Sequence, residues 1–268
     1  MILYGIMIFI PVNELKQLYH YPVLSKPDLG FIRGPGPGFG NLLFPIGRAL
    51  QEAQLTKQIF VRPTMLNFKV GPALRRESDF RLYQKEFKKR SFDDWIDFFR
   101  VNIYNDKVKI YSGEGNLFYD IKKSNLLIKN WLLLNTLESP INNFGKIAVH
   151  IRRGDFQKSN KSDFSHQIPT LWYIDAVDRL LCKVDMDVVL FSDSKVSNEW
   201  SKFGSRVTLS KNKSACSNIL SMSTADFLIA SRSTFSLWSY FLSKQKVYFP
   251  KGLDLKKYIN YSENIYYV

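Results

Sequence analysis

Cysteine is nearly absent from this sequence. The 268 residues hold only two, Cys182 and Cys216, and neither belongs to a CxxC pair. A disulfide framework needs several paired cysteines and a structural zinc site needs a cluster of soft ligands, so neither is indicated. We therefore expect a protein of a reducing cytoplasm.

Long apolar runs are also missing. The N-terminal run, MILYGIMIFIPV at residues 1–12, is shorter than the about 20 residues that a membrane-spanning helix needs. It lacks the basic start and the small-residue cleavage site of a signal peptide, so a strand or a partner surface is the better prediction. We expect a protein that is soluble or peripheral to a membrane.

Acidic residues are scarce relative to basic ones. The chain has 24 Asp and Glu against 38 Lys and Arg, for a net charge of +14, which calls for an acidic partner. Nucleic acid, an anionic membrane surface and phosphate-bearing small molecules all fit this charge. No RNA-recognition, KH, zinc-finger or basic-zipper pattern is present, so we expect no nucleic-acid ligand. A membrane-facing basic patch remains a second candidate.

Apolar segments are what the chain does have, at 45% hydrophobic content. In the C-terminal half, short apolar strands are predicted at 147–151, 187–192, 206–210, 226–231 and 246–250, with helical stretches at 169–184 and 233–244. Buried strands that alternate with helices predict a parallel sheet covered on both faces. The predicted fold class is therefore α/β.

The N-terminal half is harder to assign. It has one glycine-rich turn into a helix, after which residues 75–125 are aromatic and charged and are predicted to be mostly helical. The segment from Ser139 to Gly145 is the best linker candidate. We therefore divide the chain into domains 1–145 and 146–268.

The segment IAVHIRRGDF at 147–156 ends a predicted strand with unusual charge. Alternation along the strand places His150 and Arg152 on one face and Ile151 and Arg153 on the other. At the carboxyl end of a parallel strand, the planar and permanently charged guanidinium of Arg152 can bind a diphosphate. Asp155 follows in the turn, where it can hold an arginine. From the residues alone, a solvated turn beside a core histidine is an equally good interpretation.

Two further strand ends carry polar side chains. In LFSDS at 190–194, Asp193 stands where a base or ribose could donate hydrogen bonds to it, although an ordinary Asp turn has the same pattern. In DFLIASRSTFSLW at 226–238, Ser233 and Thr234 begin a helix, so they form either an anion pocket or a simple N-cap. Phe235 follows them, in an aromatic stripe with Trp238 and Phe241 that is typical of a core face.

The segment GPGPGFGNLLFPIGRAL at 34–50 is rich in glycine. Gly38, Gly40 and Asn41 precede or begin a helix, which lets the backbone approach a ligand at the helix N-terminus. The spacing matches neither GxGxxG nor a Walker P-loop. The DxD pair Asp185 and Asp187 precedes a strand at the end opposite the other candidates, so we expect no metal site there.

Together these motifs resemble a known family. GFGN, HIRRGD, FSD and STFSLW, in this order and with PTMLNFKVGPALRRESDFRLY at 63–83, resemble the bacterial α-1,2-fucosyltransferases of glycosyltransferase family 11. They are more distantly similar to the α-1,6- and protein O-fucosyltransferases, which share HxRRxD. The resemblance runs from about residue 34 to 245.

The resemblance implies a GT-B-like fold of two facing Rossmann-type domains, with residues 1–145 on the acceptor side. Residues 146–268 would then hold the donor GDP-fucose, without a metal or other cofactor. Arg152 would bind the donor β-phosphate, supported by His150 and Arg153. The remaining donor contacts would come from Gly38, Gly40, Asn41, Asp193, Ser233, Thr234 and Phe235.

The function expected from this is inverting transfer of L-fucose to a hydroxyl of an oligosaccharide or lipid-linked glycan. The site would be cytoplasmic, at the inner membrane face, in cell-surface polysaccharide (O-antigen) synthesis. Arg152 would stabilise charge on the leaving GDP. Asp155, Glu77 and Asp79 are candidate bases. The alternatives are another nucleotide sugar on the same fold, a basic nucleic-acid-binding protein, and a non-catalytic sugar-binding module.

Overall fold

The structure, a computed structural model, describes residues 18–28, 32–34, 36–65, 83–103, 107–153, 167–252, 255–259 and 264–268. The N-terminal apolar run at 1–12, for which a strand or a partner surface is expected, lies outside the described residues. Among the helices of these ranges, none is both long and apolar enough to cross a bilayer.

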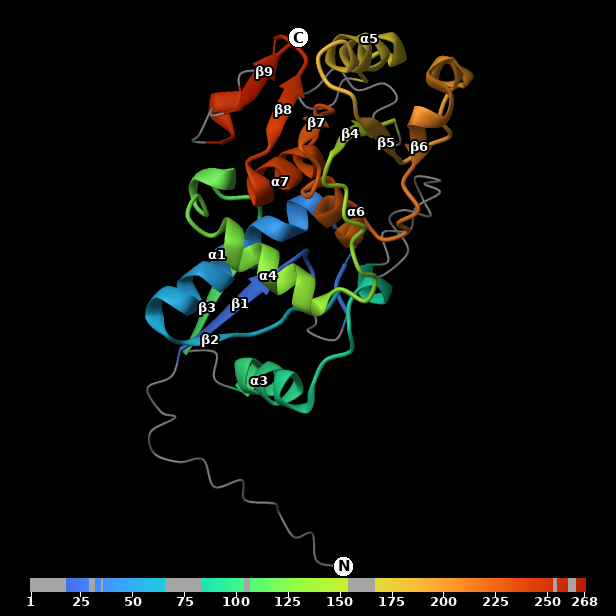
Figure 1. Cartoon of the computed structure of the whole chain (residues 1–268). Helices are drawn as coiled ribbons and strands as arrows, with labels where there is room; N and C mark the ends of the chain where they lie inside the picture. Colours follow the sequence, from blue (N-terminus) through green and yellow to red (C-terminus); the bar gives the residue numbers. More distant parts are fainter. Residues whose placement is uncertain are drawn as a thin grey trace, which may run out of the picture.

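Two parallel sheets form the framework (Figure 1). The first has the order β2-β1-β3, with β1 at Tyr19–Val23, β2 at Ile59–Phe60 and β3 at Val108–Ser112. The second has the order β6-β5-β4-β7-β8-β9, with β4 at Lys146–Ile151, β5 at Asp187–Ser192, β6 at Val207–Leu209, β7 at Phe227–Ile229, β8 at Lys246–Phe249 and β9 at Ile265–Tyr267. The named strands pair in parallel, which confirms the predicted α/β class with two facing, GT-B-like halves.

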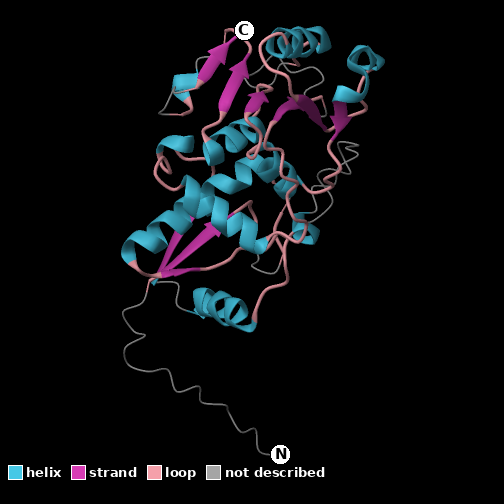
Figure 2. Ribbon diagram, viewed as in Figure 1, coloured by secondary structure: helices cyan, strands magenta, loops and turns pink. Residues whose placement is uncertain are grey.

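Helices fill the space between the sheets and cover their outer faces (Figure 2). The inner helices are α1 (Phe39–Thr56), α4 (Asn125–Asn135), α6 (Ala215–Met222) and α7 (Thr234–Ser243). The outer helices are α3 (Phe92–Ile103), which packs on β1, and α5 (Thr170–Leu181), which packs on the second sheet. Short 3₁₀ turns are η2 (Tyr83–Glu86), η4 (Leu117–Tyr119), η6 (Asn198–Arg206) and η7 (Leu255–Lys257).

One hydrophobic core joins the inner helices to the inner face of the second sheet. Trp238 on α7 is fully buried, and its ring lies 5.1 Å from that of Phe44 on α1 and 4.9 Å from that of Phe118. A Cβ on Gly47 would lie 2.8 Å from Ile128 Cδ1, so α1 and α4 approach closely at this glycine. Residues from both sides of position 145 therefore share this core.

The side chains of β4 alternate between the two faces of the second sheet. Ala148 belongs to the core with α6 and α7, and His150 contacts Ser236 on α7. Ile147, Val149 and Ile151 pack with α5 on the other face. The alternation predicted for His150 and its neighbours is thus confirmed.

The prediction for residues 75–125 was right for α3 and wrong for β3. Residues Val108–Ser112 pair with β1 along the whole strand instead of forming a helix. In VKIYS only Tyr111 is buried, while Lys109, Ile110 and Ser112 are exposed, so the strand lacks the continuous apolar run of a buried strand. The strand exists because its backbone pairs with β1, which lies far away in the sequence.

Candidate active site

The order of the second sheet reverses at β4. Strands β5 and β6 extend the sheet on one side of β4, and β7, β8 and β9 extend it on the other. In open α/β sheets, ligands bind beyond the carboxyl ends of the strands at such a switch point. The residues that follow β4 and β7, which include Arg152 and Ser231 to Thr234, lie at this edge because β4 and β7 pair in parallel.

His150 links three elements beneath this edge. Its Nδ1 lies 2.6 Å from Ser236 Oγ and 2.7 Å from Ser231 Oγ, and the Phe235 ring stacks on the imidazole at 5.1 Å. Burial, and to a lesser extent the charge of Arg152, lowers the pKa of His150 to about 3. The imidazole is therefore neutral near pH 7. It can position its neighbours, but it does not carry a charge to a ligand.

Arg152 is held in place by Asp193. Arg152 Nη1 lies 2.7 Å from Asp193 Oδ2, and the two side chains are 29% and 24% exposed. The backbone N–H of Arg153 donates to the other carboxylate oxygen of Asp193 at 2.8 Å. One carboxylate thus orients both arginines, which is the role that the sequence offered to Asp155. Asp155 lies outside the described residues.

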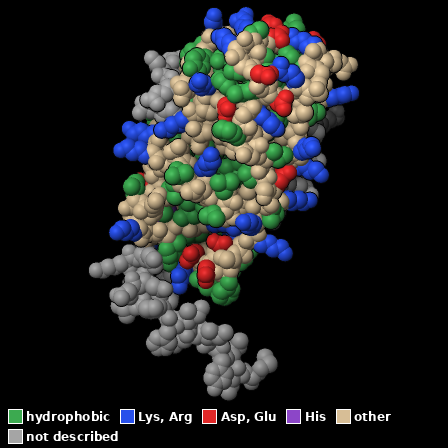
Figure 3. Space-filling view, viewed as in Figure 1, with side chains coloured by type: hydrophobic (Ala, Val, Ile, Leu, Met, Phe, Trp, Pro, Cys, Tyr) green, Lys and Arg blue, Asp and Glu red, His purple; other side chains and the backbone are tan. Residues whose placement is uncertain are grey.

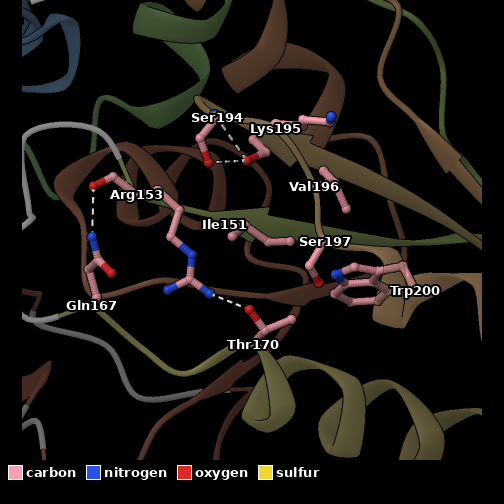
Figure 4. A pocket seen from close by; sticks show the side chains of 10 residues that line it. Ile151, Arg153, Gln167, Thr170, Ser194, Lys195, Val196, Ser197 and Trp200 are labelled. Atoms are coloured by element: carbon pink, nitrogen blue, oxygen red, sulfur yellow. Dashed lines mark hydrogen bonds between the residues drawn. The ribbon is translucent and has the colours of Figure 1, made fainter.

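The Arg153 side chain turns to the opposite face of β4. Its guanidinium donates to the Ile168 carbonyl at 2.6 Å and to Thr170 Oγ1 at 2.7 Å, at the start of α5 (Figure 4). The two adjacent arginines therefore serve different surfaces of the sheet.

The N-termini of α1 and α7 meet at the same edge. Thr234 Oγ1 donates to Asn41 Oδ1 at 2.6 Å, and Trp238 Nε1 donates to the Gly40 carbonyl at 2.6 Å. A Cβ on Gly40 would lie 3.0 Å from Thr234 Oγ1, so only glycine allows this approach without displacement. The Phe39 N–H at the start of α1 donates to Tyr83 Oη at 3.0 Å, and the Phe235 N–H at the start of α7 donates to Ser233 Oγ. What favours an anion near these two N-termini is therefore the positive end of each helix dipole.

Ser233 and Gly38 play more ordinary parts. Ser233 is the N-cap of α7, and its Oγ accepts the Phe235 N–H at 3.2 Å. Gly38 is the N-cap of α1, and a Cβ added there would meet no atom within 4 Å. The capping interpretation therefore holds for Ser233, and no close approach requires a glycine at position 38.

Sequence reasoning missed Glu114. Asn41 Nδ2 donates to Glu114 Oε1 at 2.5 Å, and burial raises the pKa of this carboxyl above its ordinary value. Arg48 on α1 holds the loop by donating to the carbonyls of Ser112 at 2.8 Å and Gly113 at 2.5 Å. Glu114 follows the carboxyl end of β3, so recognising that strand would have exposed it as a candidate.

The predicted donor-site residues that the structure describes fall into three groups. We use the name switch-point cluster for those at the edge between β4, α1 and α7, namely Gly40, Asn41, His150, Arg152, Asp193, Thr234 and Phe235. Arg153 lies on the other face, whereas Ser233 and Gly38 cap helices. Glu77 and Asp79 lie outside the described residues. In the DxD pair, Asp185 binds Arg206 at 2.7 Å at the amino end of β5, away from the cluster.

Comparisons with known proteins give one family and a set of solved structures. The sequence model described as "Glycosyl transferase family 11" matches residues 41–250. A crystal structure of POFUT1 in complex with GDP is similar at 10% identity and a TM-score of 0.47, over 85% of this chain and 95% of that chain. The fucosyltransferase NodZ from Bradyrhizobium is similar at 13% identity and a TM-score of 0.43, over 85% and 94% of the two chains. No curated protein matches this sequence.

Proposed function

Because the chain belongs to glycosyl transferase family 11, we propose that it transfers L-fucose from GDP-fucose to a hydroxyl group of a glycan acceptor. The family match over residues 41–250 confirms the resemblance drawn from the motifs and makes the chain a glycosyltransferase. The choice of fucose is supported by the HIRRGD and STFSLW motifs, which resemble those of fucosyltransferases.

The observation that carries this proposal is the position of Arg152. A guanidinium at the carboxyl end of β4, oriented by Asp193, stands at the edge where the N-termini of α1 and α7 meet. As the bond to the sugar breaks, negative charge grows on the leaving GDP. Preorganised cations and N–H groups stabilise that charge more in the transition state than in the ground state. A cation already present in the chain does the work of a divalent metal, so we propose a metal-independent reaction.

The other members of the cluster are proposed to position this arginine and the diphosphate. His150 and Phe235 form a packed, neutral support beneath Arg152. Asn41 and Thr234, joined by a hydrogen bond, bring polar groups of both halves to the diphosphate. Asp193 is oriented by both arginines and would meet the guanosine through its remaining lone pairs.

Inversion at the sugar carbon requires the acceptor hydroxyl to attack from the face opposite GDP, and a base to take its proton. We propose Glu114 as this base, because its raised pKa suits proton transfer near neutral pH. Asn41 binds Oε1 of Glu114, and Oε2 has no hydrogen bond within the described part of the chain. Asp155, Glu77 and Asp79 stay as predicted alternatives.

The acceptor is proposed to be an oligosaccharide or lipid-linked glycan used in cell-surface polysaccharide (O-antigen) synthesis, met at the cytoplasmic face of the membrane. The net charge of +14 supports contact with an anionic membrane surface or an anionic substrate. Figure 3 shows Lys and Arg side chains spread over the visible face rather than gathered in one patch. Sedimentation with vesicles of anionic and neutral lipid tests this contact, and equal sedimentation with both would reject it.

The test of the reaction is sugar release and transfer from GDP-fucose in the presence of EDTA, together with thermal shifts by GDP, UDP and single-stranded DNA. We expect selective stabilisation by GDP and turnover that survives the chelator. A preference for UDP would support a different nucleotide sugar, and stabilisation by DNA alone would support a nucleic-acid-binding protein. Binding of GDP-fucose with no turnover on any glycan or water would support a non-catalytic module.

A further inference from the structure

A separate pocket of about 280 Å³ lies at the carboxyl ends of β4 and β5, on the face of the sheet that α5 covers (Figure 4). We call it the α5-side pocket. Its lining consists of Ile151, Arg153, Gln167, Thr170, Ser192, Ser194, Lys195, Val196, Ser197 and Trp200. Ile151 and Arg153 belong to the face of β4 opposite His150, so the pocket and the switch-point cluster lie on different faces of the strand.

One buried donor in the pocket has no partner. Trp200 is 5% exposed, and its Nε1 makes no hydrogen bond within the described part of the chain. An indole N–H can only donate, and a buried donor left unpaired costs about 1–3 kcal/mol. Figure 4 shows the nitrogen edge of this indole beside Ser197, facing the pocket. A ligand that supplies an acceptor here would remove that cost.

The lining includes two basic side chains, those of Arg153 and Lys195. The Arg153 guanidinium donates to the neutral oxygens of Ile168 and Thr170, and no carboxylate of the described residues lies within ion-pair distance of that guanidinium. Lys195 is exposed, and none of the ten lining residues is Asp or Glu. The hydroxyls of Ser192, Ser194 and Thr170 add further donors, whereas the Ser197 hydroxyl already donates to Glu199 Oε2 at 2.9 Å. The complementary ligand is anionic and rich in oxygen acceptors.

The volume limits the size of that ligand. Sites for drug-sized ligands have about 300–1,000 Å³, and the α5-side pocket lies just below this range at about 280 Å³. It accommodates a single sugar unit rather than a complete nucleotide sugar.

We propose that the α5-side pocket binds one anionic sugar unit, a monosaccharide that carries a phosphate or a carboxylate. Its role as an anchoring subsite for the glycan acceptor rests on the proposed function, whereas the binding itself does not. Asp193 contacts both arginines, because its carboxylate accepts the backbone N–H of Arg153 and pairs with the side chain of Arg152. An acceptor anchored here would lie at the same carboxyl edge of β4 as Arg152, on the opposite face of the strand.

The test is calorimetric titration of the full chain with glucose 6-phosphate and glucuronic acid, with glucose and inorganic phosphate for comparison. We expect saturable binding of both anionic sugars, and weaker or no binding of the two comparison probes. Trp200→Phe keeps an aromatic ring and removes the N–H, so it should weaken the binding of glucose 6-phosphate about tenfold. Lys195→Gln should weaken it severalfold, since an exposed charge contributes less.

Matched controls lie on α5 and just beyond its end. Trp172 donates to the Val268 carbonyl away from the pocket, and Lys183 is exposed. Trp172→Phe and Lys183→Gln should leave the affinity for glucose 6-phosphate unchanged. The thermal midpoint of each variant is measured first, so that a loss of fold is not mistaken for a loss of binding.

Three results would overturn the proposal. The first is no saturable binding of either anionic sugar to the folded protein. The second is equal affinity for glucose or inorganic phosphate, because one half of the ligand would then contribute nothing. The third is displacement of the sugar by GDP, which would make the pocket part of the donor site. A parallel GDP titration separates the two failures. If the protein binds GDP and neither anionic sugar, only the proposed subsite is rejected. If it does not bind GDP, the proposed function is rejected.

Discussion

The two faces of β4 end in different kinds of surface, although the strand is continuous and adjacent residues build both. On the α7 face, His150 and the hydroxyls of Ser231 and Ser236 satisfy one another, and Arg152 is paired with Asp193. On the α5 face, Arg153 is bound to neutral oxygens and Trp200 keeps an unpaired N–H. The first face is preorganised by its own groups, and the second offers donors that remain to be used.

This difference teaches how one motif can serve two ligands. In HIRRGD the alternation of a strand sends consecutive residues to opposite faces, so two adjacent arginines need not share a task. Substitutions on one face of β4 should therefore leave the properties of the other face unchanged.

The largest effect is expected from Arg152. Arg152→Ala should lower kcat by about 10²–10³-fold, the usual loss when a preorganised donor to a developing anion is removed. Stability should change little, because its ion pair is partly exposed.

Arg153→Ala should show the reverse, with a loss of about 1–3 kcal/mol of unfolding free energy from its two hydrogen bonds and a smaller effect on kcat. Steady-state kinetics and urea unfolding of both variants check this contrast, and equal kinetic losses would contradict it.

Glu114→Gln is expected to lower kcat by about 10²-fold, within the range for loss of a general base. Glutamine keeps an oxygen for the Asn41 amide, so the loss is chemical rather than structural. The base acts when ionised, so activity falls as the pH falls through its pKa, and burial places that fall above the pH expected for an ordinary glutamate. The acid limb of the kcat/KM profile should vanish in the variant. Glu52→Gln, at a glutamate paired with Lys109 on the surface, should keep the wild-type profile.

Gly40→Ala should destabilise the chain by about 1–3 kcal/mol, because the added methyl would press on Thr234 and Phe235. Gly38→Ala is the matched control, since a methyl group there meets no atom within 4 Å. Urea unfolding compares the two variants. If both unfold at the wild-type urea concentration, the close approach of α1 and α7 is wrong. Titration of the folded Gly40→Ala variant with glucose 6-phosphate should still saturate, because the α5-side pocket lies on the face of β4 opposite the switch-point cluster.

The last prediction concerns His150, whose effect on stability is confined to acid pH. Its pKa is about 3 in the folded chain, against about 6.5 for an exposed histidine, so the unfolded chain binds more protons between these values. Folding stability from this group is therefore present above pH 6.5 and is lost as the pH falls toward 3, by about 1 kcal/mol per pH unit. Urea unfolding between pH 4 and 7 should show a shallower pH dependence in His150→Gln than in the wild type. Parallel curves would show that the buried imidazole does not titrate as argued.

The predictable parts of the fold are the strands in which consecutive residues are buried, because such strands show as continuous apolar runs in the sequence. β4 and β5 are covered on both faces, so they have continuous apolar runs, and β5 was predicted at its observed bounds of 187–192. β3 was missed because only Tyr111 in it is buried, so its sequence carries little hydrophobic pattern. Glu114 was missed with it.

The site shows the same division. Alternation predicted correctly which face of β4 each arginine follows. The partners of those arginines were not predictable, because Asp193 and Thr170 reach them through pairings across the fold rather than along the chain. Trp200 gave no signal, since an unpaired N–H is defined only by what surrounds it in space.

The core shared by α1, α4, α6 and α7 decides whether the two halves of this chain can fold as separate fragments. A cut at residue 145 leaves each sheet with its own strands but separates Trp238 from Phe44 and Phe118. Each fragment would expose an apolar helical surface, and truncating a single buried tryptophan already costs about 3–5 kcal/mol. The two fragments are thus expected to be insoluble when expressed singly and to reassemble when expressed together, as in a split-protein reporter.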